Sequence, residues 1–180
     1  MPIITQVRDY DGFVTKAKRL DLMRLVDEAE HAITSFQLAL EESKFANGTR
    51  GIRQSIDQGF ELAGNWQKAV TGRVDWRKTN RRGASVGAEV QVSGRSDLLA
   101  VDVLHLKTDI ASGVMDIGLI IVPDDKTSYF LTDRTPNFST AIKHIDLHAS
   151  DLPIRVIAFS HDCIGPPLPK MRTNLGRSQA

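Results

Sequence analysis

The sequence contains a single cysteine, Cys163, among its 180 residues, which excludes a scaffold held together by disulfides. Its longest uncharged apolar run covers only residues 117–123, far too few to span a membrane. The first dozen residues include Arg8, Asp9 and Asp11 and lack the apolar centre of a secretory signal. No glycine-rich phosphate loop or dinucleotide-binding motif is present. We therefore expect a cytoplasmic protein without a membrane segment.

The composition is that of a globular protein, since 41% of the residues are hydrophobic and 25% are charged. A chain of 180 residues suits one compact domain better than two, so we expect a single catalytic or binding domain over residues 1–180. Prolines at positions 166, 167 and 169 end the regular structure. The residues from about 170 to 180 are then expected to form a mobile basic tail.

The formal net charge of +1 conceals an uneven distribution of charge along the chain. Residues 20–43 contain six acidic side chains and one basic one, whereas residues 44–82 contain nine basic and three acidic ones. Such segregation can present a basic face to a polyanion such as DNA, although many charge asymmetries are only solvated surfaces.

Apolar periodicity predicts alternating helices and strands. Three- and four-residue spacing predicts helices over residues 20–40, 52–70, 98–106 and 138–145. Two-residue alternation or short β-branched runs predict strands over residues 86–93, 115–122, 129–131 and 154–159. This order predicts an α/β fold with a central mixed β-sheet flanked by helices.

The segment around the first predicted strand carries the most informative polar residues. Glu89 and Gln91 are two residues apart, so on a strand both side chains point to one face. Asp75 lies on the preceding extended segment, and the three side chains could meet at the open end of a hairpin. Oxygen ligands of this kind suit Mg²⁺, and Arg81 and Arg82 in the same hairpin could contact a phosphate backbone.

The spacing of these residues is also compatible with purely structural roles. Acidic and polar residues that alternate on a strand often form only a solvated face, and Asp75 could simply stabilise a turn after Gly72.

A set of short segments, taken together, resembles the type II restriction endonucleases of the BamHI and BglII group, within the PD-(D/E)XK nucleases. The segments occur in that group's order between about residue 50 and residue 170. They are Asn65-Trp66, Val74-Asp75-Trp76-Arg77-Lys78, Gly87-Ala88-Glu89-Val90-Gln91, residues 115–123, Tyr129-Phe130-Leu131-Thr132-Asp133-Arg134 with Asn137-Phe138, and residues 167–170.

The resemblance implies a restriction-endonuclease-like fold in which Asp75 and Glu89 bind Mg²⁺ and act with Gln91 in catalysis. Gln91 takes a position that is Glu or Gln in this group and Lys in most PD-(D/E)XK nucleases. A glutamine cannot act as a general base at neutral pH, so its implied role is to orient the attacking water. The group's additional polar or acidic residue near the end of the second helix has no counterpart at the matching place, and Glu61 lies about two turns earlier.

The same resemblance implies which residues read DNA. Asp133 and Arg134 match a pair that reads G·C base pairs in the major groove, where Arg donates to guanine and Asp accepts from cytosine. A surface Asp–Arg turn after a strand is the simpler alternative, because exposed ion pairs are common and contribute little. Arg95 and Ser96 lie in the stretch that contacts the central base pairs, with Arg95 where an Asn is prominent in the group.

These inferences predict a nuclease that hydrolyses double-stranded DNA at a short palindromic site with Mg²⁺. A palindrome implies a homodimer, for which the analogy indicates a helical contact near residues 98–107. The gene of a cognate DNA methyltransferase is expected nearby. Two alternatives remain: a repair or modification-dependent nuclease with the same chemistry, and a catalytically inactive DNA-binding protein of the same fold.

Overall fold

A computed structural model describes residues 1–68, 74–92 and 98–170. Its centre is a six-stranded sheet in the order β1-β7-β6-β5-β4-β3. The strands are β1 (Ile3–Asp9), β3 (Gln67–Lys68), β4 (Trp76–Thr79), β5 (Ser85–Val90), β6 (Ile117–Pro123) and β7 (Ile154–Ser160). Strands β5, β6 and β7 run parallel, and the strands outside them pair antiparallel. The predicted central mixed sheet is therefore confirmed.

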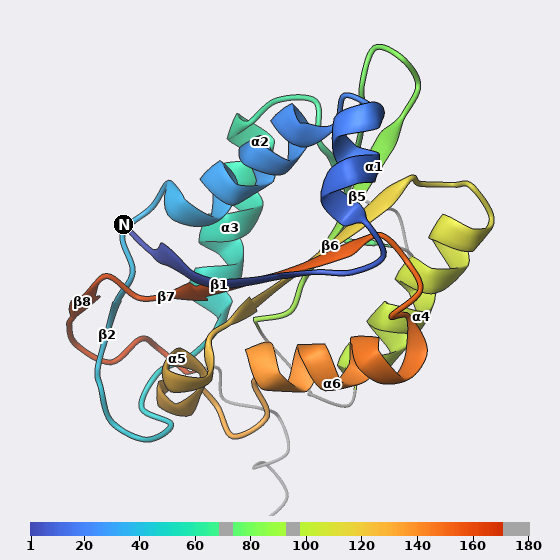
Figure 1. Ribbon diagram of the computed structural model, residues 1–180. Helices are drawn as coiled ribbons and strands as arrows, with labels where there is room; N and C mark the ends of the chain where they lie inside the picture. The colour runs from blue at the N-terminus through green and yellow to red at the C-terminus, as the bar shows by residue number, and fades with distance from the viewer. Residues whose placement is uncertain (69–73, 93–97, 171–180) are drawn as a thin grey trace, which may run out of the picture.

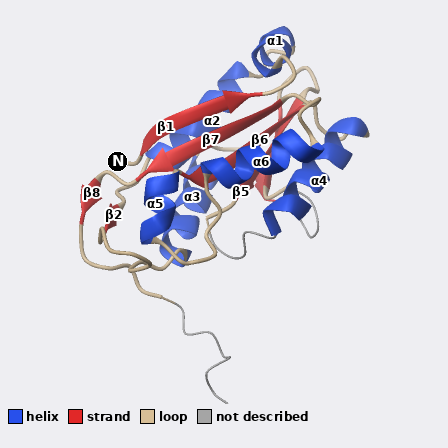
Figure 2. Ribbon diagram, turned by 60° about the horizontal axis from the view of Figure 1, so that its bottom comes forward, coloured by secondary structure: helices blue, strands red, loops and turns tan. Residues whose placement is uncertain are grey.

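Helices cover both faces of this sheet (Figures 1 and 2). Helices α1 (Phe13–Arg19), α2 (Met23–Thr34) and α3 (Arg50–Leu62) lie on one face, and α4 (Leu98–Ala111) and α6 (Phe138–His148) lie on the other. Strand β6 is buried along its whole length because its alternate side chains pack into both layers. No helix in the described ranges is both long enough and apolar enough to cross a membrane.

Helix α3 is held close to α2 at one glycine. A Cβ atom placed on Gly59 would lie 2.4 Å from the backbone oxygen of Ala32, so no larger residue fits without moving a helix. This close contact sets the position of α3, whose first two turns reach the carboxyl end of β5.

The helix predicted over residues 20–40 ends earlier than expected, at Thr34. The Thr34 hydroxyl donates to the Glu30 carbonyl oxygen at 3.0 Å, which is typical of hydroxyl groups that compete with helix hydrogen bonds. Residues Ala39–Leu40 instead form β2, which pairs in parallel with β8 (Cys163–Ile164). Because β2 pairs with a segment far along the chain, the apolar periodicity of residues 20–40 alone could not predict it.

Two other element predictions need correction. The helix predicted over 52–70 ends at Leu62, and Gly64 and Asn65 then take left-handed backbone angles with φ of 73° and 61°. The strand predicted over 129–131 is wrong. Residues 129 and 130 belong to helix α5 (Asp125–Phe130), and residue 131 follows it. The N-cap residue of this helix, Asp124, accepts a hydrogen bond from the Thr127 amide at 2.7 Å.

Strand β1 was missed and the strand predicted over 86–93 ends at Val90, with residue 93 outside the described residues. Strand β1 is an edge strand that is largely exposed, so it lacks the apolar alternation that reveals a buried strand.

Buried Asn47 joins three segments at one end of the molecule. Its side-chain amide donates to the Glu41 and Phe130 carbonyl oxygens at 2.8 and 2.9 Å, and its oxygen accepts from the Leu168 amide at 3.1 Å. The loop before α3, the end of α5 and the chain after β8 therefore form one connected surface beside the N-terminus of α3 (Figure 1).

Candidate active site

Asp75 and Glu89 meet at the carboxyl end of β5. Strands β4 and β5 pair antiparallel with Trp76 opposite Ala88, which places Asp75, just before β4, beside the end of β5. The Val90 amide donates to Asp75 Oδ2 at 2.9 Å. Because Val90 packs toward α1–α3, the alternating Glu89 side chain points to the side of the sheet that α4 covers. The hairpin therefore brings these two carboxyl groups together.

Glu89 is an ionisable side chain that is almost completely buried. It is 3% exposed, and its Oε1 atom has no hydrogen-bond partner within the described part of the chain. Burial, together with the negative charges of Asp75 and Asp102, raises the pKa of Glu89 to about 10. The folded protein therefore keeps this carboxyl protonated at neutral pH.

Arg53 of α3 contributes a positive charge at the same place. Its guanidinium forms an ion pair with Asp75 Oδ1 at 2.8 Å and donates to the Val90 carbonyl oxygen at 2.7 Å. Burial acts to lower the pKa of Arg53, but the hydrogen bond and charge of Asp75 outweigh it and the pKa is raised. Arg53 thus fixes the orientation of Asp75 and neutralises one of the clustered carboxylates.

Asp57, one turn further along α3, holds Arg53 in place. It accepts hydrogen bonds from Arg53 Nε at 2.9 Å, Trp76 Nε1 at 3.0 Å and Lys68 Nζ at 2.9 Å. Burial acts to raise the pKa of Asp57, but these three donors lower it overall. The carboxylate of Asp57 is therefore occupied by these three donors, and its role is to hold Arg53 in position.

Gln91 and Asp102 complete the cluster on the α4 side. The side-chain nitrogen Nε2 of Gln91 donates to Asp102 Oδ2, and the backbone amide of Gln91 donates to the Ile121 carbonyl oxygen at 2.9 Å. Burial, then the charge of Asp75, raises the pKa of Asp102 to about 6. Three carboxyl groups and one amide thus surround the end of β5, with Arg53 as the cation bonded to Asp75.

Sequence reasoning identified Asp75, Glu89 and Gln91 as site residues but missed Arg53, Asp57 and Asp102. Arg53 and Asp57 come from a helix about twenty residues earlier, and their contacts depend on how α3 crosses the sheet. Asp102 did give a local signal, because it is the one acidic side chain in the apolar helical stretch 98–106. An acid on a helix that packs against a sheet needs a polar partner there.

Three other polar residues lie away from this cluster. Arg81 and Arg82 occupy the closed end of the β4–β5 hairpin. They lie about 15 Å along β5 from Glu89, given the rise of a strand, so they do not join the acid cluster, and their contact with a phosphate backbone stays a prediction. Glu61 is exposed near the end of α3 and does not join the cluster.

Asp133 and Arg134 are exposed in the turn between α5 and α6. The Thr132 and Thr135 hydroxyl groups, 2.9 Å apart, brace this turn. In the described part of the chain no ion pair joins Asp133 to Arg134, but both lie in an exposed surface turn, as the simpler alternative expects, and this turn follows helix α5 and not a strand. Arg95 and Ser96 lie outside the described residues.

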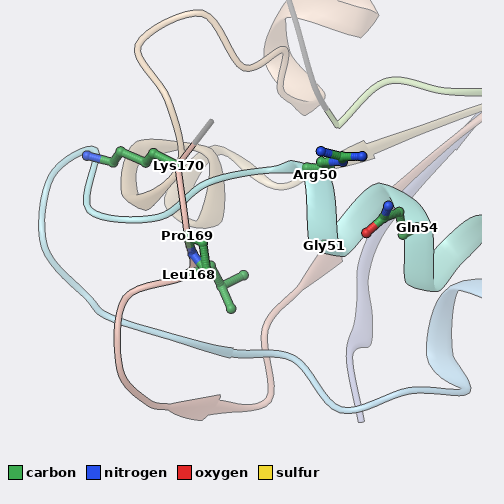
Figure 3. A pocket seen from close by; sticks show the side chains of 6 residues that line it. All are labelled: Arg50, Gly51, Gln54, Leu168, Pro169 and Lys170. Atoms are coloured by element: carbon green, nitrogen blue, oxygen red, sulfur yellow. The ribbon is translucent and has the colours of Figure 1, made fainter. Parts of the chain in front are cut away.

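A hollow of about 320 Å³ lies between the start of α3 and the chain after β8 (Figure 3). Its lining residues are Arg50, Gly51, Gln54, Leu168, Pro169 and Lys170. The Lys170 side chain extends away from the helix, and Arg50 stands at the helix start (Figure 3). Basic and amide groups therefore occupy the surface next to Arg53.

Comparison with known proteins finds a similar fold among solved structures but no match by sequence. No protein-family model and no curated protein matches the sequence. Among solved structures, the restriction endonuclease BglII complexed with a DNA 16-mer matches with a TM-score of 0.67 and 16% identity, over 87% of this chain and 78% of that chain. Free BglII matches with a TM-score of 0.57 and 18% identity, over 87% and 79% of the two chains. The chain has a restriction-endonuclease-like fold.

The raised pKa of Glu89 predicts how stability depends on pH. The carboxyl binds its proton up to about pH 10 in the folded protein but only to its ordinary value of 4.5 when unfolded. Stability therefore falls as pH rises above 4.5. In metal-free buffer at pH 8, Glu89→Gln should raise the free energy of unfolding by roughly 2–4 kcal/mol, with no gain below about pH 4.

Urea denaturation at several pH values measures this difference. Glu61→Gln, which changes an exposed glutamate, serves as the control and should stay within about 0.5 kcal/mol of the wild type. A Glu89→Gln variant that follows the wild-type pH dependence would show that Glu89 ionises normally in the folded protein.

Proposed function

We propose that this chain is a type II restriction endonuclease, similar to the BamHI and BglII group, that hydrolyses double-stranded DNA at a short palindromic site with Mg²⁺. The proposal is carried by one observation: in a restriction-endonuclease-like fold, a buried Glu89 oxygen without a partner among the described residues lies beside Asp75 at the end of β5. The fold is shared with a protein solved in complex with DNA. Residues 44–82 also contain nine basic and three acidic side chains, which can present a basic face to a polyanion.

The donor set suits Mg²⁺. Asp75 and Glu89 would hold the ion, since it prefers oxygen ligands and usually takes one or two carboxylates together with water and substrate phosphate. A cation here would also offset the burial and the neighbouring negative charges that together raise the pKa of Glu89.

The side chains around the ion would each have a separate task. When bound, Mg²⁺ supplies the positive charge that activates water and stabilises the charge on the reacting phosphate. Asp75 stays oriented through Arg53 and the Val90 amide. Gln91 is a neutral amide, so it can accept a hydrogen bond from the attacking water but cannot remove its proton.

DNA recognition is assigned to the exposed turn between α5 and α6 and to the stretch after β5 that lies outside the described residues. Arg134 can donate two hydrogen bonds to guanine, and Asp133 can accept one from cytosine. Both side chains are exposed and without partners in the described part of the chain, so they are available for base contacts. Arg95 and Ser96 are proposed to contact the central base pairs.

A homodimer is proposed from the exposed face of α4. Leu98, Val101 and Leu104 are 43–46% exposed and follow one another at three-residue spacing, which gives α4 an uncovered apolar row. A twofold contact through this row would place one active site on each DNA strand of a palindrome. A cognate methyltransferase encoded nearby and a cytoplasmic location complete the proposal.

Cleavage of unmethylated phage DNA in Mg²⁺ tests the activity. Wild-type protein should give discrete fragments whose sequenced ends share one palindrome, and Glu89→Ala should cut at least about 1000-fold more slowly because a ligand is lost. Glu61→Ala should cut like the wild type.

Three results would contradict the proposal in different ways. Binding of DNA without cutting, unchanged in Glu89→Ala, would indicate an inactive DNA-binding protein. Cutting only of methylated or damaged DNA would indicate a modification-dependent or repair nuclease. An absence of both binding and cutting in Mg²⁺ and Mn²⁺ would reject a nuclease function.

The proposed dimer contact predicts the behaviour of Val101→Glu. A charge in the middle of the apolar row should convert the dimer to a monomer, because a buried unpaired charge is costly. Sedimentation velocity measures the change. Leu62→Glu, at a 79% exposed position on α3, is the matched control and should leave the dimer intact. A dimer that survives Val101→Glu would place the subunit contact elsewhere.

A further inference from the structure

Gln91 and Asp102 form a pair that couples the end of β5 to helix α4. Gln91 follows β5 directly, and its backbone amide donates to the Ile121 carbonyl oxygen of β6 at 2.9 Å. Asp102 lies in the second turn of α4, and its Oδ2 atom accepts a hydrogen bond from Gln91 Nε2. The pair therefore joins the sheet to the helix that covers its face.

The chemistry of the two groups fixes which way the amide faces. An ionised carboxylate only accepts hydrogen bonds, so the amide must turn its nitrogen to Asp102. The amide oxygen then points away from Asp102. Glu89 and Gln91 are two residues apart at the end of β5 and share one face of the sheet, and the intervening Val90 amide donates to Asp75, which places the Gln91 amide beside these acids.

We propose that Asp102 is a positioning residue that holds Gln91 with its oxygen directed toward Asp75 and Glu89, so that this chain requires an amide, and not a carboxylate, at position 91. The inference rests on the proposed nuclease function for its effect on activity. The pair itself is a structural feature that can be tested without cleavage.

The pair explains why a glutamate would not serve at position 91 in this chain. After Gln91→Glu, the new carboxylate would meet Asp102 with two acceptors and no donor, and it would be a fourth carboxyl group beside Asp75 and Glu89. Both effects oppose folding and displace the oxygen that the site needs. An asparagine at position 102 would remove the conflict, because its NH₂ group can donate to the new carboxylate.

Three variants test the pair: Gln91→Glu, Asp102→Asn, and the two changes combined. In buffer without divalent cations, Gln91→Glu should lower the melting temperature by about 4 °C or more, and the double variant should recover most of that loss. Gln58→Glu places the same change at an exposed position of α3 and should shift the melting temperature by less than about 1 °C. No recovery in the double variant would overturn the proposal.

Cleavage provides a second, separate readout. Gln91→Glu should lower kcat at least about 10-fold with little change in the KM for DNA, since the DNA-reading residues are untouched, and the double variant should return to within about 3-fold of the wild type. A double variant no more active than Gln91→Glu would contradict the proposal. So would an Asp102→Asn variant that needs as much extra Mg²⁺ as Glu89→Gln, because Asp102 would then be a metal ligand.

The two readouts separate the possible failures. If the wild type does not cut DNA, the proposed function fails, and the melting temperatures still decide whether Asp102 and Gln91 act as a pair. If the wild type cuts but the double variant rescues neither stability nor kcat, the positioning role fails and the nuclease remains.

Discussion

The burial of Glu89 beside two other carboxyl groups is the constraint on which the site depends. The side chain is 3% exposed, and one of its oxygens lacks a partner within the described residues. Such an arrangement destabilises the folded chain at neutral pH, since Glu89 must take up a proton there that it does not hold when unfolded. A divalent cation would turn the same feature into an advantage, because it neutralises the cluster and uses the free oxygen. This unfavourable burial, which a bound cation would relieve, is the main support for the proposed function.

The surrounding elements hold the cluster in a fixed geometry. Arg53 binds Asp75 and the backbone of Val90 together, and Asp57 fixes Arg53. The close contact of Gly59 with α2 sets the position of α3, which carries both residues. On the other side, α4 supplies Asp102. The site is therefore built where two helices from opposite layers reach the end of one buried strand.

The sequence predicted this strand and its two carboxyl groups because the information is local. Alternation through residues 86–90 marks the strand, and the spacing of Glu89 and Gln91 places both on one face. Partners supplied by helix crossings, such as Arg53 and Asp102, have no fixed spacing to the strand and were missed. The false strand at residues 129–131 has a different cause, because the Asp124 N-cap is a local signal for a helix that the strand prediction did not take into account.

The most direct test of this account is calorimetric titration of the protein with Mg²⁺ in buffers of different ionisation enthalpy. Glu89 must lose its proton to bind a cation, so binding at about pH 7–8 should release about one proton per site. Glu89→Gln should bind more weakly and release close to none. Binding without proton release, or binding that is unchanged in Glu89→Gln, would contradict the claim that the buried carboxyl of Glu89 is a cation ligand.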